Sequence, residues 1–445
     1  MSDAAVNDAG LTDAVDDDVV DLCRDLIRID SSNPTSNERE AAEWVAERLS
    51  DAGLEPQAYE ADPGRVSVVA RWAGEDSSKE ALLIHGHLDV VPADADDWQV
   101  HPFAGEIRDD CLWGRGAVDM KDMDAMMLAV LRDWTRQGRR PPRDVVFAFV
   151  ADEEAGGLQG ANFLTTQHPD LFEGCTTAVS EVGGFSLTVE GQRLYAIQTA
   201  EKGIEWLRLV ARGRAGHGSM LNDDNAVTSV AEAVARVGRH SFPIELIPSS
   251  EAFLRELAAL FDMTFDASDV ESVLAKLGPL TKMVGASVRN TANPTMLEAG
   301  YKQNVIPQKA TAYLDCRVLP GGEEQFLESI GELVGPDVAV EIVQASPAYE
   351  TSFDGDIVDA MTAAISAEDP DGKCVPYCLS GSTDAKSFGD IGMRCFGFSP
   401  LRLPADLDFF GMFHGVDERV PLDGLRFGAR ALSRFIGSDW KSAGS

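Results

Sequence analysis

Apolar positions in the first 200 residues predict alternating helices and strands. They recur at helical spacing over 19–27 and again over 120–137. Short β-type runs occupy 65–72 and 81–84, and DVVFAFV at 144–150 is a continuous apolar run, typical of a strand buried on both faces. This alternation predicts an α/β fold with a mixed, mostly parallel sheet and helices on both of its faces.

The pattern changes near Lys202. The predicted order from there is strand, helix, strand, strand, helix, strand, at 204–212, 225–237, 290–300, 309–319, 323–333 and 338–343. The order βαββαβ is the ferredoxin-like α+β pattern. Residues 240–285 form a mainly helical insertion within it. After Ala345 the first kind of alternation resumes.

These patterns predict a discontinuous organisation. Residues 1–15 are predicted to be a disordered tail, and residues 16–202 and 347–441 a catalytic domain. Residues 203–346 form the second, inserted domain. A chain of 445 residues is long enough for two or three such domains or lobes.

Charge narrows the possible functions. The chain has 74 Asp and Glu against 38 Lys and Arg, a formal charge of -36. Such a surface repels phosphate backbones and anionic lipids, so we expect no nucleic-acid partner and no membrane partner. We interpret the acidity as favouring solubility.

No apolar run is long enough for a membrane span, and the first residues lack signal-peptide features, so a cytoplasmic location is expected. The seven cysteines include no CxxC pair and suggest no disulfide framework.

Three of the seven histidines, at positions 87, 217 and 414, lie beside glycines at predicted strand ends or in loops. Imidazole and carboxylate groups are the ligands that zinc and similar divalent metals prefer. His87 and Asp89 are two residues apart and project to one side of an extended segment, so Asp89 can orient the His87 ring or bind metal itself. A core histidine at a strand end is the alternative.

Four carboxylates also lie at the ends of predicted strands or at the start of a predicted helix. Asp119, in GRGAVDMK, begins a predicted helix, where it is either a metal ligand or an ordinary N-cap. Glu153 and Glu154 follow the 144–150 strand, where ligands gather in open α/β sheets, and suit a general base and a metal ligand. A solvated acidic turn is the alternative. Glu181 follows another short apolar stretch and is a further candidate ligand.

The remaining motifs give weaker evidence for a functional site. The segment 156–160 lies between a strand and a helix like a dinucleotide loop, but it lacks the full GxGxxG pattern, and two glutamates precede it. No GxSxG elbow and no P-loop are present. The polar segment 380–386, with Gly381 and Ser382, is typical of a substrate-contact loop.

Nine short motifs taken together indicate a family. They occur in the order HGHLDVVP, GRGAVDMK, DEE, SEVGG, AGHGS, NVIP, DCRVLPGG, SGSTDAK and FHGVDE. In this order the chain, from about residue 16 to 440, resembles the dinuclear zinc metallohydrolases. That family contains aminoacylase, carboxypeptidase G, acetylornithine deacetylase, succinyl-diaminopimelate desuccinylase and carnosinase-type dipeptidases.

The resemblance implies a role for each matching residue. The implied metal ligands are His87, Asp119, Glu154, Glu181 and His414. Asp119 bridges both metals, and the peptide bond after this residue is often cis in the family. His87 and Glu181 complete one set of ligands, and His414 and Glu154 the other.

The resemblance also implies the remaining parts of the site. Glu153 is the general base and Asp89 supports His87, while His217, Asn304 and Arg317 contact the substrate and the oxyanion. In many members the inserted domain acts as a lid, forms a homodimer and lends its histidine to the partner's active site.

The resulting prediction is a two-metal exopeptidase or aminoacylase-like amidohydrolase. It cleaves a peptide or N-acyl bond next to a free carboxylate, using a metal-bridging water that a glutamate activates. Two divalent ions are required, with zinc expected and cobalt or manganese also compatible. The substrates are small peptides or N-acyl amino acids. A specific desuccinylase or deacetylase and a non-catalytic binding relative are the alternatives.

Overall fold

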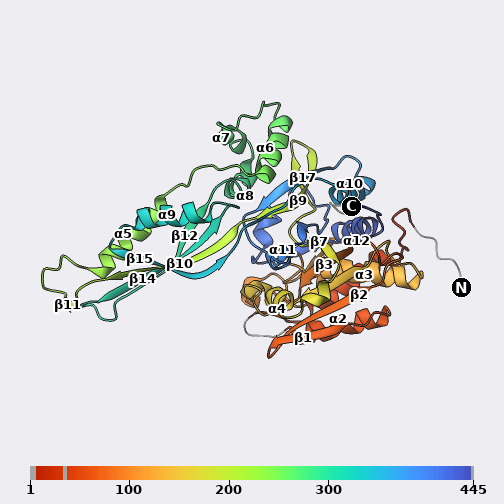
Figure 1. Ribbon diagram of the computed structural model, residues 1–445, viewed down its shortest axis with the longest axis horizontal. Helices are drawn as coiled ribbons and strands as arrows, with labels where there is room; N and C mark the ends of the chain where they lie inside the picture. The colour runs from red at the N-terminus through yellow and green to blue at the C-terminus, as the bar shows by residue number, and fades with distance from the viewer. Residues whose placement is uncertain (1–6, 34–37, 442–445) are drawn as a thin grey trace. The chain divides into compact units, whose positions relative to one another are not determined.

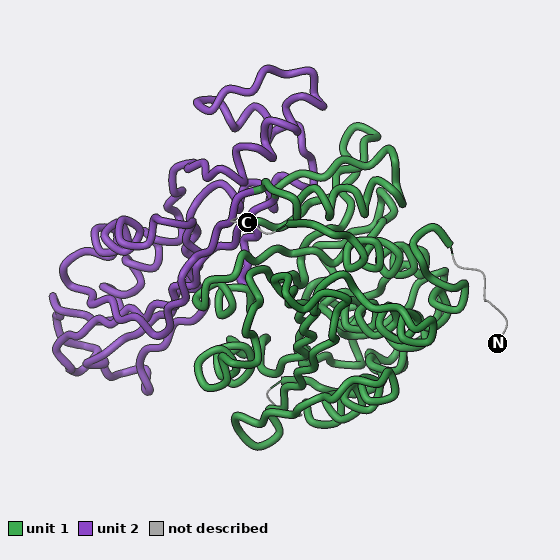
Figure 2. Tube along the Cα trace, turned by 45° about the vertical axis from the view of Figure 1, so that its right-hand side comes forward, with its two compact units in different colours: residues 1–199, 353–376, 383–445 green, residues 200–352, 377–382 purple. Residues whose placement is uncertain are grey.

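The computed structural model describes residues 7–33 and 38–441, and the chain separates into two compact units (Figure 2). Unit 1 comprises Met1–Thr199, Phe353–Pro376 and Thr383–Ser445. Unit 2 comprises Ala200–Ser352 and Tyr377–Ser382.

Unit 1 contains a mixed sheet in the order β1-β2-β6-β3-β7-β18-β9 (Figure 1). Its strands are β1 (Gln57–Asp62), β2 (Arg65–Trp72), β3 (Ala81–His87), β6 (Val145–Val150), β7 (Cys175–Ser180), β9 (Gln192–Glu201) and β18 (Arg394–Gly397). The central strands β6, β3, β7 and β18 are parallel, and β1, β2 and β9 pair antiparallel beside them. The predicted mixed, mostly parallel sheet is therefore confirmed.

Shorter strands and the helices complete this part of the chain. The strands are β4 (Glu106–Arg108), β5 (Cys111–Trp113), β8 (Phe185–Val189), β17 (Lys373–Leu379) and β19 (Arg419–Pro421). The helices are α1 (Val15–Ile27), α2 (Arg39–Asp51), α3 (Lys121–Arg136), α4 (Ala161–Gln167), α10 (Asp356–Glu368), α11 (Ala385–Gly389) and α12 (Leu422–Ile436).

Helices cover both faces of this sheet, as two neighbouring residues of β3 demonstrate. A Cβ atom at Gly86 would meet the side chain of Asp124 in α3 at 2.3 Å. The ring of His85, the preceding residue, lies 4.5 Å from the ring of Phe388 in α11. Successive residues of a strand point to opposite faces, so α3 and α11 lie on opposite sides. Helices α1 and α12 pack against α3.

Unit 2 contains an antiparallel sheet in the order β12-β14-β10-β15. Its strands are β10 (Gly203–Arg212), β12 (Thr291–Ala299), β14 (Lys309–Val318) and β15 (Val338–Ser346). Helices α5 (Ala226–Arg239) and α9 (Glu323–Val334) share one hydrophobic core with alternate residues of these strands. The βαββαβ order predicted from the sequence is present.

Shorter elements complete unit 2. They are β11 (Gly216–His217), β13 (Val305–Ile306), β16 (Tyr349–Glu350), α6 (Pro248–Leu260), α7 (Val270–Leu274) and α8 (Thr281–Ala286). Helices α6 and α7 lie within the range predicted to be a helical insertion, and α8 ends one residue beyond it.

Two local features differ from the sequence prediction. Residues 1–6 of the predicted tail lie outside the described residues, but residues 7–14 form turns in which Leu11 is buried and Thr12 donates to Asp133 of α3. That contact joins residues 121 positions apart, so no local pattern reveals it. Asp119 is not the N-cap of α3; Met120 holds that position, without a side-chain cap.

Candidate metal centre

Five potential metal ligands come from separate segments of unit 1. His87 ends β3, Glu154 follows β6, and Glu181 follows β7. The three strands are parallel neighbours, so their carboxyl ends lie at one edge of the sheet. Asp119 precedes α3, and His414 lies in the loop before β19.

Unusual backbone conformations shape two of these segments. Asp152 has φ +70 and turns the chain sharply after β6, so that Glu153 and Glu154 follow at the strand end. Aspartate tolerates this left-handed region better than most residues. Gly116 has φ +86 before Asp119, where a Cβ atom would meet Lys121 at 2.9 Å. The peptide bond between Asp119 and Met120 is cis, as the resemblance implied.

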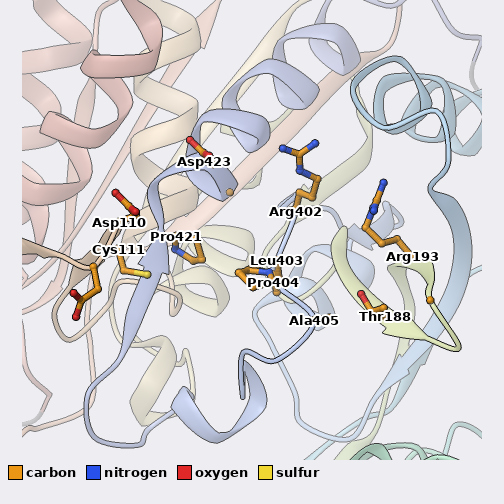
Figure 3. Close-up of a pocket in the computed structure, with 13 residues that line it drawn as sticks. Asp110, Cys111, Thr188, Arg193, Arg402, Leu403, Pro404, Ala405, Pro421 and Asp423 are labelled. Carbon is orange, nitrogen blue, oxygen red and sulfur yellow. The ribbon is translucent and has the colours of Figure 1, made fainter.

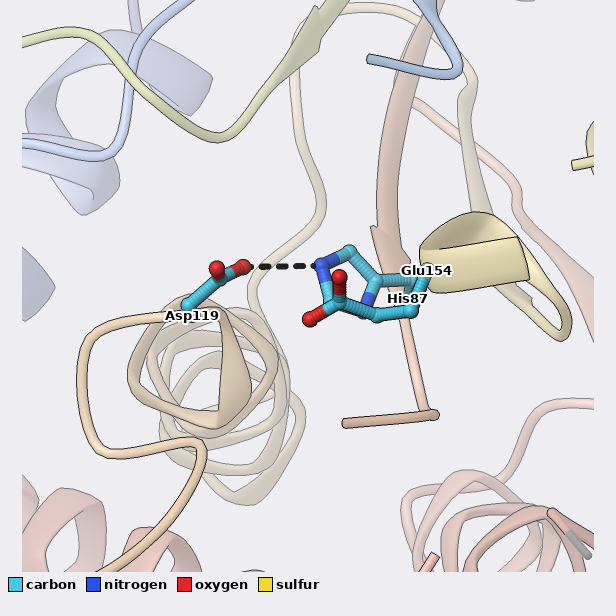
Figure 4. A group of neighbouring side chains, drawn as sticks. All are labelled: His87, Asp119 and Glu154. Atoms are coloured by element: carbon cyan, nitrogen blue, oxygen red, sulfur yellow. Dashed lines mark hydrogen bonds and ion pairs between the residues drawn. The ribbon is translucent and has the colours of Figure 1, made fainter. Parts of the chain in front are cut away.

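The two carboxylate oxygens of Asp119 face different histidines. Oδ1 lies 3.1 Å from Nε2 of His87, which is also 3.5 Å from Oε2 of Glu181. Oδ2 lies 3.4 Å from Nε2 of His414, which is also 3.0 Å from Oε2 of Glu154. Figure 4 shows His87, Asp119 and Glu154 around this centre. Asp119 therefore lies between two groups, each with one imidazole and one further carboxylate.

These separations fit divalent metal ions. Zinc binds nitrogen and oxygen at about 2.0–2.2 Å in tetrahedral sites, so two of its ligand atoms lie about 3.3 Å apart. The four separations around Asp119 run from 3.0 to 3.5 Å. Imidazole with carboxylate suits zinc, and cobalt and manganese also accept it. Glu153 lies close enough to His87 and Glu181 to be counted as an alternative ligand.

Asp89 has a wider role than the sequence suggested. Nδ1 of His87 lies 2.9 Å from the Asp89 carbonyl oxygen, which only accepts, so Nδ1 carries the hydrogen and Nε2 is free to bind metal. The Asp89 carboxylate accepts from the backbone N–H groups of Glu153 and Glu154, at 3.1 and 3.0 Å. It also accepts from the side-chain amide of Asn33 at 3.0 Å. Asp89 thus holds the segments of both glutamates as well as the histidine.

The site is buried and strongly acidic, which shifts the pKa values of its groups. Burial and the neighbouring Glu181 raise the pKa of Glu153 well above its usual range. Burial raises the pKa of Glu181 to about 7. Hydrogen bonds to Asp119 and Glu154 raise the pKa of His414 to about 10. Burial opposes ionisation of Asp119, but hydrogen bonds from the two histidines hold its pKa below the usual range. In the metal-free protein, protons bound to these side chains reduce the net negative charge of the site.

Metal uptake is therefore expected to release protons. His414 must lose its proton to bind a metal, and its pKa of about 10 means that it is protonated at pH 7. The apparent affinity for Zn²⁺ should accordingly rise from pH 6 to pH 9, by up to about tenfold per pH unit for each proton released. Calorimetry in buffers of different ionisation enthalpy measures the number of protons. His414→Ala should release fewer protons, and a pH-independent affinity would contradict the expectation.

The candidate substrate contacts of unit 2 lie in two places. His217 and Asn304 are neighbours, because β11 pairs with β13 and Gly218 donates to the Asn304 carbonyl at 2.9 Å. Arg317 forms an ion pair with Asp315 at 2.7 Å near the other end of β14. Arg317 is eight positions from Lys309, which begins β14 shortly after β13, and eight residues span roughly 26 Å in a strand. Gly381 and Ser382 follow β17 and also belong to unit 2.

A substrate with a second carboxylate requires a further cationic contact, and three buried cationic side chains already have partners within their own units. Arg115 is buried and pairs with Glu418 at 2.6 Å. Lys121 is buried and donates to two backbone carbonyls of the α1 region. Lys202 donates to the carbonyls of Ala286 and Arg289. This reduces the support for a desuccinylase, whose substrate carries an additional carboxylate.

Sequence reasoning missed some residues around the centre. Asn33 contacts Asp89 from 56 positions away, and Asp384 is buried close enough to raise the pKa of Glu153. The DAK motif contains Asp384, but a motif alone does not reveal that its carboxyl group is buried. The pairing of Arg115 with Glu418 was also missed, although each residue lies in a motif.

A separate cavity of about 520 Å³ lies elsewhere in unit 1 (Figure 3). Its lining includes Cys111, Arg193, Arg402 and Asp423, and none of the candidate metal ligands. Arg193 pairs with Asp369 through two hydrogen bonds. The cavity is therefore distinct from the metal centre.

The imidazole and carboxylate groups gathered at the strand ends of this α/β sheet form a candidate metal site, and comparison with known proteins gives the family of the chain. A family model described as peptidase family M20/M25/M40 matches residues 83–438. The chain belongs to this family, whose members include metallopeptidases and aminoacylases.

Individual relatives agree with this assignment. Aminoacylase-1 of Sus scrofa is 30% identical over 409 residues, covering 90% of each chain. The di-peptidase Dug1p of Saccharomyces cerevisiae has a similar structure, with a TM-score of 0.72 at 16% identity over 96% of each chain. A Bacillus subtilis protein described as a dinuclear metal-binding peptidase of family M20 gives a TM-score of 0.60 at 13% identity, covering 95% of this chain and 98% of the other.

Among the described residues, no helix has both the length and the apolar character that crossing a membrane requires.

Proposed function

We propose that the protein hydrolyses an amide bond next to a free carboxylate, in a dipeptide or an N-acyl amino acid, with two divalent metal ions. The main support is Asp119, whose two oxygens face two different histidine–carboxylate groups. The likeness to aminoacylase-1 and to a di-peptidase supports the two substrate classes.

In this proposal His87 and Glu181 hold one ion, His414 and Glu154 hold the other, and Asp119 binds both. A shared carboxylate offsets the repulsion between two nearby cations. The bound ions would polarise the substrate carbonyl and lower the pKa of a nearby water. We favour zinc because of the ligand types, and cobalt or manganese would also fit.

Glu153 is the proposed general base. Its carboxylate takes a proton from water as the oxygen attacks the amide carbon, and passes that proton to the leaving nitrogen. Support comes from its position beside the candidate ligands and from the hydrogen bond between its backbone N–H and Asp89, which fixes the segment.

Unit 2 is the proposed lid and the source of substrate contacts. Arg317 is the proposed contact for the free carboxylate, which would replace Asp315 as the partner of its Nε and Nη2 donors. His217 and Asn304 can donate to the developing oxyanion. Because His217 pairs with β13, which precedes the Lys309 end of β14, and Arg317 lies near the other end of that strand, we propose that a single small substrate does not contact both in one subunit. A homodimer in which each lid supplies His217 to the partner resolves this difficulty. Sedimentation of the metal-loaded protein tests it, and a monomer that is fully active would contradict it.

Removing and restoring the metal tests the function directly. The purified chain is treated with a strong chelator, reloaded with Zn²⁺ or Co²⁺, and assayed against a panel of dipeptides and N-acyl amino acids. We expect no turnover without metal, recovery with about two ions per chain, and preference for substrates with a free carboxylate over their amides. Full activity in the metal-free protein would refute the proposal. Tight binding of the panel without turnover would instead favour a binding protein.

A further inference from the structure

A buried ion pair joins the two loops that carry Asp119 and His414. Nη1 of Arg115 lies 2.6 Å from Oε2 of Glu418, and Nη2 donates to the Gly415 carbonyl at 2.8 Å. Arg115 is 3% exposed and Glu418 is fully buried. Both arms of one guanidinium therefore reach the segment that follows His414.

Glu418 holds the other loop in return. Its Oε2 accepts from the backbone N–H of Gly116 at 3.1 Å, and its Oε1 accepts from that of Val118 at 2.8 Å. These two N–H groups lie just before Asp119. The Glu418 carboxylate thus fixes the backbone just before Asp119. Its partner Arg115 fixes the backbone just after His414.

The His414 loop needs such an anchor. The His414 side chain is 58% exposed, and its backbone has φ +56, in a region that non-glycine residues rarely adopt. Such a conformation persists only where the surroundings hold it. Nearby anchors include the bond from Arg115 to the Gly415 carbonyl and two bonds from Gln99 to the Asp417 carboxylate, each 2.8 Å.

We infer that Arg115 and Glu418 are positioning residues for the second metal ion, the one bound by His414 and Glu154. This inference rests on the proposed two-metal function. Arg115 donates from two nitrogens of one rigid guanidinium to Glu418 and to the Gly415 carbonyl, and the single ammonium group of a shorter lysine cannot reproduce both bonds. Arg115→Lys should keep a positive charge beside Glu418 but lose the bond to Gly415, so it should loosen the His414 loop and leave the Asp119 loop in place.

The experiment titrates the metal-free, full-length chain with Zn²⁺ in competition with a chelator of known affinity. Loss of a residue that orients a metal ligand typically weakens metal binding by about 10–100-fold. We expect Arg115→Lys to weaken the second binding step by at least about tenfold and to leave the first within about threefold. Glu418→Gln should weaken both steps, because its amide nitrogen cannot accept a hydrogen bond and so loses a contact to the loop that leads into Asp119, the ligand proposed to serve both ions.

Arg143→Lys is the matched control. Arg143 is also buried and donates to backbone carbonyls, of Glu80 and Trp440, and Glu80 lies at the opposite end of β3 from His87. The control should leave both steps unchanged even if it lowers thermal stability. Circular dichroism confirms that each variant is folded, and Glu418→Gln provides the test if Arg115→Lys does not fold.

The possible outcomes separate the two proposals. If the unmodified chain binds fewer than two ions, the two-metal function fails. If it binds two and Arg115→Lys alters neither step, alters both equally, or behaves like Arg143→Lys, the positioning role is overturned and the function stands.

Discussion

Replacing Glu153 with alanine is expected to reduce turnover by at least about 10³-fold while the protein still binds two metal ions. General base catalysis contributes roughly 10²–10⁴-fold, and no other described carboxylate combines this position beside His87 and Glu181 with a backbone bond to Asp89. Steady-state kinetics and metal analysis of the same sample measure both quantities. Glu153→Gln, which keeps the size of the side chain, should lose as much activity.

Metal content distinguishes the base from a ligand. Glu153 lies near enough to His87 and Glu181 to bind a metal itself. If it does so, the alanine variant will lose a metal ion together with its activity, and the base assignment fails. Glu173→Gln serves as the control, because this side chain is exposed and remote from the candidate ligands in the sequence.

Replacing Asp119 with alanine is expected to abolish tight binding of both ions. Each oxygen of this carboxylate faces a different histidine, so its removal takes one donor from each group and leaves the remaining carboxylates to repel each other. His87→Ala or His414→Ala should mainly weaken one binding step. Titration of the metal-free variants with Zn²⁺ measures the two steps.

Asp119→Asn gives a more specific test of the prediction that Asp119 binds both ions. Its single amide oxygen can serve one ion, so we expect one step to survive in part and the other to be lost. Asp371→Ala, at an exposed position, is the control and should bind two ions. Normal binding of both ions by Asp119→Ala would show that this residue is no bridge.

The elements that the sequence predicted well have strong local patterns. The 144–150 run became β6, with every residue buried, because an uninterrupted apolar strand is stable only between two covered faces. The βαββαβ order of unit 2 was equally readable from its periodicity. Strands β1, β8 and β9 were not predicted, since their pairing depends on partners rather than on their own patterns.

For the candidate site, too, the sequence predicted some features and not others. The types and order of the residues in the motifs led to His87, Asp119, Glu153, Glu154 and His414. The sequence did not reveal that the Asp89 carboxylate holds the backbone of both glutamates, or that Asn33 supports it. The position of Asp119 at a predicted helix start left a metal ligand and an ordinary N-cap both open, and the structure gives the N-cap position to Met120.

The sequence by itself therefore determined the kinds of elements, the family and the set of chemical groups, because periodicity and motif order are local properties of the chain. Only the tertiary structure decided how those groups are arranged. The two oxygens of Asp119 face different histidines because β3, α3 and the His414 loop converge on one point. Arg115 and Glu418 pair across 303 positions because both are buried where their loops meet, and a buried charge is stable only beside a partner.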